Sequence, residues 1–150
     1  MPIKGVNILI ADDDQDDCLL MREAFKDCKI AGQLHFVQDG DALLDYLKRR
    51  TPYQDQQRYP VPDLILLDLN MPRMDGREAL ALIKRDPELK TIPVVVLTTS
   101  SAEEDVLRSY GDGVNSFVTK PVSYSGLVEV IRALGHYWID VVDLPTKGRK

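Results

Sequence analysis

The 150 residues include 24 acidic and 19 basic side chains, a formal net charge of −5, and 44% of them are hydrophobic. This composition is typical of one globular domain with a substantial core, and the negative charge disfavours non-specific binding to nucleic acid or anionic membranes. No apolar run approaches the roughly 20 residues of a membrane span and no secretory leader opens the chain, so we expect a cytoplasmic protein. In that compartment Cys18 and Cys28 should be reduced thiols.

Five apolar segments alternate with helical patterns along the chain. The predicted strands are 6–11, 34–37, 64–67, 94–97 and 116–118. Apolar residues at helical spacing follow each strand, around 19–25, 43–47, 80–83, 102–110 and 127–138. Asp75 and Glu78 fit a capping box that opens the third helix. The first, third and fourth strands are continuously apolar, which is typical of strands covered on both faces.

This alternation predicts right-handed crossovers and a parallel sheet with helices on both faces. We therefore expect an α/β fold: a flavodoxin-like, doubly wound (βα)5 unit whose five-stranded parallel sheet has the order 2-1-3-4-5. A single domain is expected over residues 1–150, with a core of about 5–137 and a short C-terminal extension of about 138–150. The connection 49–62 carries three prolines and is longer than such a fold needs.

Acidic residues follow two of the predicted strands directly. Asp12 and Asp13 end the first strand, and Asp68 ends the third. Because the order 2-1-3 makes these strands neighbours, their carboxylates should meet at one edge of the sheet. Like charges about 4 Å apart repel by on the order of 4 kcal/mol at an effective dielectric near 20, so such a cluster must hold protons or a cation. Hard oxygen ligands suit Mg²⁺.

Two further polar residues belong to the same edge. Thr98 closes the fourth strand, and Lys120 follows the fifth. A hydroxyl and an ammonium placed there could bind the oxygens of a phosphoryl group. The neighbouring acids Asp14, Asp16 and Asp17 are better explained as solvated side chains at the start of a helix.

Four stretches, "ILIADD", "LILLDLNMPRMDG", "VVVLTTS" and "SFVTKP", resemble the conserved motifs of response-regulator receiver domains in two-component signalling. The resemblance covers about residues 5–137. It implies that Asp68 accepts a phosphoryl group from the phosphohistidine of a histidine kinase. It also implies that Mg²⁺ is bound by the side chains of Asp13 and Asp68, by Asp12 directly or through water, and by the backbone carbonyl of Asn70.

The same resemblance assigns roles to the residues after the last two strands. Thr98 would hydrogen-bond the phosphoryl group, Lys120 would pair with it, and the bond between Lys120 and Pro121 would be cis. Phe117 occupies the position of the family's switch aromatic, although its place in a strand is equally compatible with an ordinary core residue. Phosphorylation would then change the surface around the fourth helix, fifth strand and fifth helix. The protein would be a phosphoacceptor and not an enzyme with a separate substrate.

The connection 49–62 and the ending "HYWIDVVDLP" resemble a subgroup of this family, the single-domain regulators paired with bacterial phytochrome kinases. This second resemblance implies a light-sensing histidine kinase as partner and a homodimer formed through the side that runs from the fourth to the fifth helix. The apolar residues of the ending either pack back on the domain or join a partner or a second copy.

Three other classes of function are less compatible with the residues. A calcium loop from Asp12 to Glu23 has acids at suitable places, but Asp17 stands where the sharp turn requires glycine. A phosphatase of the haloacid-dehalogenase type needs a second carboxylate where the chain has Asn70. A phosphorylation-independent scaffold on the same fold is the remaining alternative.

Overall fold

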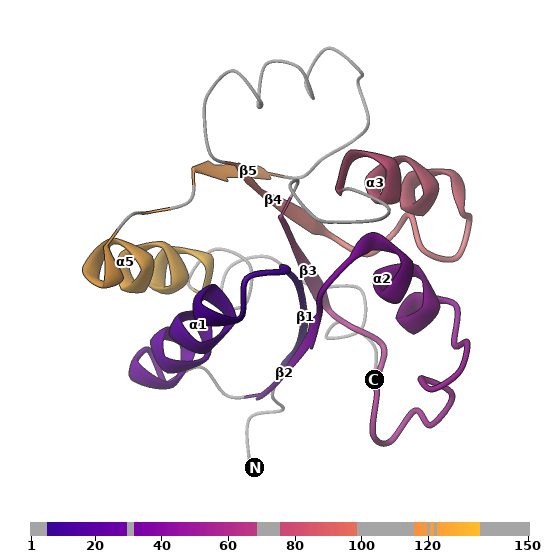
Figure 1. Cartoon of the computed structure of the whole chain (residues 1–150), viewed down its shortest axis with the longest axis horizontal. Helices are drawn as coiled ribbons and strands as arrows, with labels where there is room; N and C mark the ends of the chain where they lie inside the picture. The colour runs from indigo at the N-terminus through magenta and orange to yellow at the C-terminus, as the bar shows by residue number, and fades with distance from the viewer. Residues whose placement is uncertain are drawn as a thin grey trace.

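The computed structural model describes the chain over residues 6–29, 32–68, 76–98, 116–119, 121 and 123–135. For Thr98, Ser116, Phe117 and Thr119 it describes the backbone alone. Strands and helices alternate along these ranges (Figure 1). The strands are β1 (Val6–Ala11), β2 (Gly32–Val37), β3 (Leu64–Asp68), β4 (Val94–Thr98) and β5 (Ser116–Thr119). The helices are α1 (Gln15–Asp27), α2 (Gly40–Leu47), α3 (Gly76–Arg85) and α5 (Tyr124–Leu134).

The described strands form one parallel sheet of five strands in the order β2-β1-β3-β4-β5, which confirms the predicted fold class. β3 lies at the centre of the sheet, between β1 and β4. The helix predicted over 102–110, Asp75 of the predicted capping box and the C-terminal extension lie outside the described residues. The last helix is described as far as Leu134, short of the predicted end at residue 138.

Side-chain caps define where the helices begin. The Asp14 carboxylate accepts hydrogen bonds from the backbone N–H groups of Asp16 (2.9 Å) and Asp17 (3.2 Å), as predicted for acids at a helix start. Asp39 and Ser123 cap α2 and α5 in the same way. Among the described residues, no helix has the length and apolar character needed to span a membrane.

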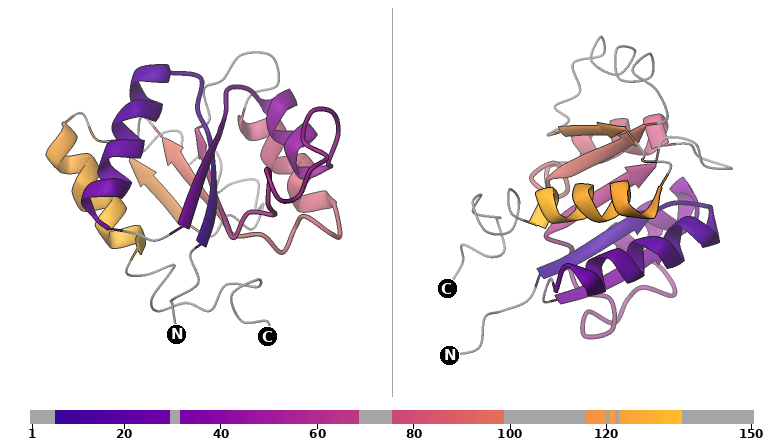
Figure 2. Two further views of the ribbon diagram at one scale, coloured as in Figure 1. Left: turned by 90° about the horizontal axis from the view of Figure 1, so that it is seen from below. Right: turned by 90° about the vertical axis from the view of Figure 1, so that its left-hand side faces the viewer.

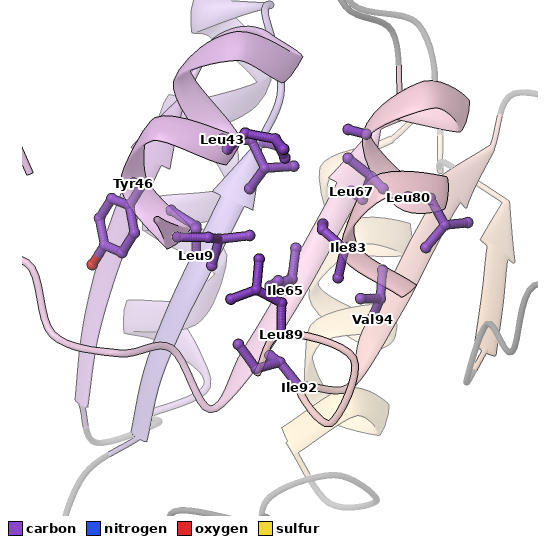
Figure 3. Close-up of a cluster of buried hydrophobic side chains, with 14 of the residues drawn as sticks. Leu9, Leu43, Tyr46, Ile65, Leu67, Leu80, Ile83, Leu89, Ile92 and Val94 are labelled. Carbon is purple, nitrogen blue, oxygen red and sulfur yellow. The ribbon is translucent and has the colours of Figure 1, made fainter. Parts of the chain in front are cut away.

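Helices cover both faces of the sheet, and each face has its own hydrophobic core. α1 and α5 lie together on one face, in front of the strands in the right-hand view of Figure 2, and α2 and α3 lie on the other. The α1/α5 core contains Met21, Phe25, Leu66, Ile131 and Leu134. The α2/α3 core contains Leu9, Leu43, Ile65, Leu80, Ile83 and Ile92 (Figure 3). Alternate residues of β3 thus supply both cores, as expected for a central parallel strand.

The first residue of β2 must be a glycine. Gly32 adopts φ +136°, a conformation that residues with a side chain rarely take. A Cβ atom at this position would lie 1.9 Å from the backbone oxygen of Val6, its register partner on β1. Close approach of the two strands therefore depends on the missing side chain.

The long connection between α2 and β3 is folded against the α2/α3 core. The hydroxyl of the buried Tyr46 donates a hydrogen bond to the backbone oxygen of Pro60 at 2.8 Å. The rings of Tyr46, Tyr53 and Tyr59 pack with centroids 5.0–5.8 Å apart. Arg49 donates from Nη1 to the backbone oxygens of Tyr53 and Tyr59. These contacts order a segment that the sequence marks only as long and polar.

Candidate functional site

Three acidic side chains meet at the carboxyl ends of β1 and β3. The β1–β3 register pairs Ala11 with Leu67. The residue after each of these, Asp12 and Asp68 respectively, therefore stands at the end of one of two adjacent strands. One carboxylate oxygen from each of Asp12, Asp13 and Asp68 lies within 4.8 Å of the other two. Asp12 is 0% exposed and Asp68 is 4% exposed, whereas Asp13 is exposed. The structure therefore brings together the three acids that the sequence places at this edge.

Backbone contacts fix the position of Asp12. Its N–H donates to the backbone oxygen of Val37 at 3.0 Å, which extends the β1–β2 ladder by one residue. Its Oδ1 accepts a hydrogen bond from the N–H of Asp14 at 2.9 Å, a local turn that holds the carboxylate over the strand end. The thiol of Cys18 on α1 donates a hydrogen bond to the backbone oxygen of Asp12 at 3.5 Å, a contact between segments that no sequence pattern predicts.

The electrostatics of the cluster favour a bound cation. The oxygens lie within 4.8 Å of one another, and at that upper limit two ionised carboxylates repel by about 3 kcal/mol at an effective dielectric near 20. Two of the three side chains are buried, so bulk water screens this repulsion only partly. The cluster offers oxygen ligands alone, and such a set fits a hard divalent ion such as Mg²⁺ or Mn²⁺ better than a soft metal.

The backbone of β4 and β5 continues the same edge of the sheet. Asp68 is paired with Leu97, so Thr98 stands one residue beyond Asp68 on the neighbouring strand. Thr98 is in turn paired with Thr119 of β5, and Lys120 is the next residue along the chain. The strand register thus places the Thr98 backbone at the edge that carries the acids, as the sequence predicts.

Several predicted site residues cannot be placed in this way. Asn70 and Lys120, and with Lys120 the predicted cis bond to Pro121, lie outside the described residues. Phe117 is described as a backbone position on β5, paired with Val96. Their predicted roles remain predictions.

The calcium-loop alternative does not fit the structure. Its twelve residues would run from Asp12 to Glu23, but α1 is helical from Gln15 to Asp27. An EF-hand loop needs those residues in an irregular, ligand-wrapping conformation. The acids around the start of α1 are therefore not an EF-hand.

Comparison with known proteins identifies the class to which this site belongs. Residues 8–132 match the response regulator receiver domain family. The chain belongs to that family, whose members are signalling proteins of two-component systems.

Individual relatives narrow the class further. The response regulator Rcp1 of Synechocystis sp. is 42% identical over 138 residues, which cover 92% of each chain. The crystal structure of a phosphorylated cyanobacterial phytochrome response regulator, RcpA, superposes with a TM-score of 0.85 at 39% identity, over 95% of this chain and 99% of that one. A Mn²⁺-bound structure of Rcp1 superposes with a TM-score of 0.81 at 41% identity, over 93% and 99% of the two chains. The protein is thus a homologue of phytochrome response regulators.

Proposed function

We propose that this protein is a single-domain response regulator that accepts a phosphoryl group on Asp68 from a sensor histidine kinase. The observation that carries the proposal is the convergence of Asp12, Asp13 and Asp68 at one end of the sheet. The family match and a relative whose structure is of a phosphorylated regulator support it.

The proposed reaction is a phosphoryl transfer between two side chains. A carboxylate oxygen of Asp68 forms a bond to phosphorus as the bond from phosphorus to the kinase histidine breaks, and the imidazole, which carries a proton on its other ring nitrogen, leaves as a neutral group. The product is an aspartyl phosphate. Water later attacks the phosphorus and releases inorganic phosphate, so the protein takes part in its own phosphorylation and dephosphorylation without turning over a separate substrate.

Asp12, Asp13 and Asp68, together with the backbone carbonyl of Asn70, would hold a divalent cation, which we propose to be Mg²⁺. When bound, the ion neutralises negative charge on the carboxylates and on the phosphoryl oxygens. The all-oxygen cluster supports this assignment, as does a relative crystallised with Mn²⁺. Among the residues of this chain, Asp12 keeps its orientation through the hydrogen bond that it accepts from the N–H of Asp14.

The remaining site residues would contact the phosphoryl group and couple its presence to a change in the surface of the domain. Thr98 would donate a hydrogen bond to the phosphoryl group, and Lys120 would pair with it. Movement of Thr98 toward the phosphoryl group would let Phe117 change its packing. The surface formed by the fourth helix, β5 and α5 would then alter. The position of Thr98 at the same edge as Asp68 supports this sequence of contacts.

We propose that the protein is cytoplasmic and that its partners are a histidine kinase of the phytochrome type and a second copy of itself in a homodimer. The kinase class rests on the phytochrome regulators among the relatives. The homodimer rests on the resemblance of the connection 49–62 and of the C-terminal extension to regulators that pair through the side running from the fourth helix to α5. Neither nucleic acid nor membrane is expected as a partner, given the net charge of −5.

The test is phosphorylation of the purified full chain with acetyl phosphate, followed by intact-mass spectrometry. One phosphoryl group should be added with Mg²⁺ present and none with EDTA. The Asp68→Asn variant should remain unmodified. Asp39→Asn is the matched control: this acid follows β2 at the same edge, and asparagine still caps α2. Labelling of Asp68→Asn at the wild-type level would move the acceptor to another residue.

A further inference from the structure

Three hydrogen bonds close the short turn between β1 and α1, where Asp12 and Asp13 stand. The N–H of Asp14 donates to the carboxylate of Asp12 at 2.9 Å, and the N–H of Cys18 donates to the backbone oxygen of Asp14 at 3.0 Å. The thiol of Cys18 reaches back to the backbone oxygen of Asp12 at 3.5 Å. A backbone oxygen only accepts, so the thiol is the donor. A side chain near the start of α1 is thus tied to the end of β1.

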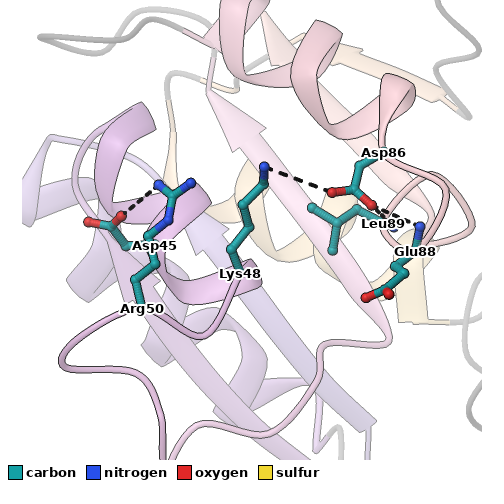
Figure 4. A network of polar contacts seen from close by, with 6 residues as sticks. All are labelled: Asp45, Lys48, Arg50, Asp86, Glu88 and Leu89. Atoms are coloured by element: carbon teal, nitrogen blue, oxygen red, sulfur yellow. Dashed lines mark hydrogen bonds and ion pairs between the residues drawn. The ribbon is translucent and has the colours of Figure 1, made fainter.

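The carboxylate of Asp13 has no anchor of its own in the described part of the chain. Carboxylates elsewhere are held by cations (Figure 4): Nζ of Lys48 lies 3.9 Å from Oδ2 of Asp86, and Nη1 of Arg50 lies 3.1 Å from Oδ1 of Asp45. No hydrogen bond or ion pair joins the exposed Asp13 carboxylate to another described residue. Its place beside the other two acids therefore depends on the backbone that carries it.

The thiol of Cys18 acts on that backbone. The Asp12 carbonyl that accepts its hydrogen bond belongs to the same peptide unit as the N–H of Asp13. Because a peptide unit is planar, a contact that fixes its C=O also fixes the direction in which the chain enters Asp13. The N–H of Asp12 is held from the other side by the backbone oxygen of Val37 at 3.0 Å. Cys18 thus restricts the orientation of Asp13 without touching its side chain.

Both the placement and the type of residue 18 suit this role. The helix that carries Cys18 is fixed at its start by the cap from Asp14 and along its length by Met21 and Phe25, which are buried in the α1/α5 core. A hydroxyl inside a helix usually donates to the carbonyl four residues earlier, which here belongs to Asp14. The thiol is a weaker donor and donates to Asp12 instead. Serine is therefore not expected to replace it.

We propose that Cys18 is a positioning residue for the divalent-ion site: its thiol, through the carbonyl of Asp12, holds the carboxylate of Asp13 where it can share an ion with Asp68. This inference rests on the proposed function, which gives the acids their ion. Without the thiol, ion binding must itself order Asp13, so the affinity falls. A thiol hydrogen bond is weak, and the expected loss of Mg²⁺ affinity is about two- to fivefold.

The test compares Cys18→Ala and Cys18→Val with the wild-type full chain. Both variants lose the donor, and valine fills about the space of the thiol. Titration with Mg²⁺, followed by NMR of the ¹⁵N-labelled protein, should show the two- to fivefold weaker binding in both. Cys28→Ala is the control: this thiol, at the other end of α1, donates to the backbone oxygen of Val128 at 3.6 Å, and its loss should leave Mg²⁺ affinity unchanged. Wild-type affinity in either Cys18 variant, or an equal fall in Cys28→Ala, would overturn the proposal.

A spectroscopic readout checks the hydrogen bond without any ion. In EDTA, the ¹³C carbonyl signal of Asp12 should move in both Cys18 variants and stay in place in Cys28→Ala, because only the former remove its donor. An unmoved signal in the Cys18 variants would show that the thiol does not bond this carbonyl in solution and would overturn the proposal.

Labelling with acetyl phosphate separates positioning from damage to the acceptor. The labelling rate of the Cys18 variants should fall at subsaturating Mg²⁺ and return to about the wild-type rate at saturating Mg²⁺. A deficit that persists at saturation would contradict a role through the ion. Absence of Mg²⁺ binding by the wild type would overturn the proposed ion site and this inference with it. Variants that match a wild type that does bind Mg²⁺ would overturn the inference alone.

Discussion

At the scale of single residues, the surroundings of Asp12 act on the charge of its carboxylate in two opposite directions. It is fully buried, and its carboxylate lies close to those of Asp13 and Asp68, which disfavours its negative charge. The hydrogen bond that it accepts from the N–H of Asp14 favours that charge and fixes its direction. The residue is thus placed at a cost in stability when no cation is bound, which is a common property of functional sites.

Replacing Asp12 by asparagine should therefore stabilise the metal-free protein. Asparagine keeps an oxygen for the N–H of Asp14 and removes one charge from the cluster. We expect the free energy of unfolding in EDTA to rise by about 1–2 kcal/mol. Urea denaturation with and without Mg²⁺ measures this effect. In the wild type, Mg²⁺ should raise stability more than in the variant; an equal gain in both would show that Asp12 does not contribute to ion binding.

The hydroxyl of Tyr46 predicts how the free energy of unfolding depends on pH. Burial is the main cause that raises the pKa of its hydroxyl to about 12. The unfolded chain, with an ordinary tyrosine pKa near 10, therefore loses this proton first, and the stabilising effect of Tyr46 declines as pH rises from about 10 to 12. Tyr46→Phe should cost about 1 kcal/mol at pH 7, because the hydrogen bond to Pro60 is lost.

Urea denaturation of both proteins at pH 7 and pH 11 measures this difference. The stability gap between wild type and Tyr46→Phe should narrow at pH 11, since the variant has no proton to lose at this position. A gap that stays constant or widens would contradict the assignment. Lysine titration affects both proteins alike and cancels in the comparison.

At the scale of elements, the start of α1 serves both the helix and the site. Asp14 is extended in conformation and accepts hydrogen bonds from the first turn, while its own N–H points back to Asp12. The cap and the acidic cluster therefore share one short turn between β1 and α1. A change in the cap should affect both.

Asp14→Ala should lower the free energy of unfolding by about 1 kcal/mol, the usual cost of losing a helix cap. Asp14→Asn is the control, since asparagine caps as well as aspartate does. Urea denaturation gives the stability, and Mg²⁺ titration monitored by NMR gives the affinity. Both should fall in the alanine variant. Equal stability of the alanine and asparagine variants would mean that the cap seen in the structure contributes nothing in solution.

At the scale of the whole molecule, the sheet joins two cores that would otherwise be independent. Alternate residues of β3 enter the α2/α3 core and the α1/α5 core. Because neither core can form without this strand, we expect the described part of the chain to unfold in one cooperative step.

Leu80→Ala and Ile131→Ala test this expectation from opposite faces. Each should reduce the free energy of unfolding by about 2–5 kcal/mol, the range for removing a buried aliphatic side chain. Far-UV circular dichroism and tyrosine fluorescence, followed in the same urea titration, should give coincident transitions for both variants. Separate transitions in either variant would show that the two faces unfold independently.

Much of this architecture is predictable from the sequence, because its signals lie in short stretches of consecutive residues. Strands β1, β3 and β4 contain the continuous apolar runs 8–11, 64–67 and 94–97, and Asp12 and Asp68 directly follow the first two of these runs. Other features depend on contacts between distant segments. Asp63 is buried because the N–H of Asn7, 56 residues earlier, meets its carboxylate. The left-handed turn at Arg49 likewise has no local signal, since glycine is the usual residue at that place.

The direction in which α1 leaves the sheet has an electrical consequence. Every strand in a parallel sheet points the same way, so the helix that follows β1 starts where the acids stand, two residues after Asp13. The aligned peptide units of a helix place a partial positive charge of about half a proton at that start. The macrodipole of α1 therefore partly offsets the mutual repulsion of the three carboxylates of the acidic cluster, whether or not an ion is bound. Because the topology places the start of α1 there, adding negative charge at this end of the sheet costs less free energy than the number of acidic residues alone would indicate.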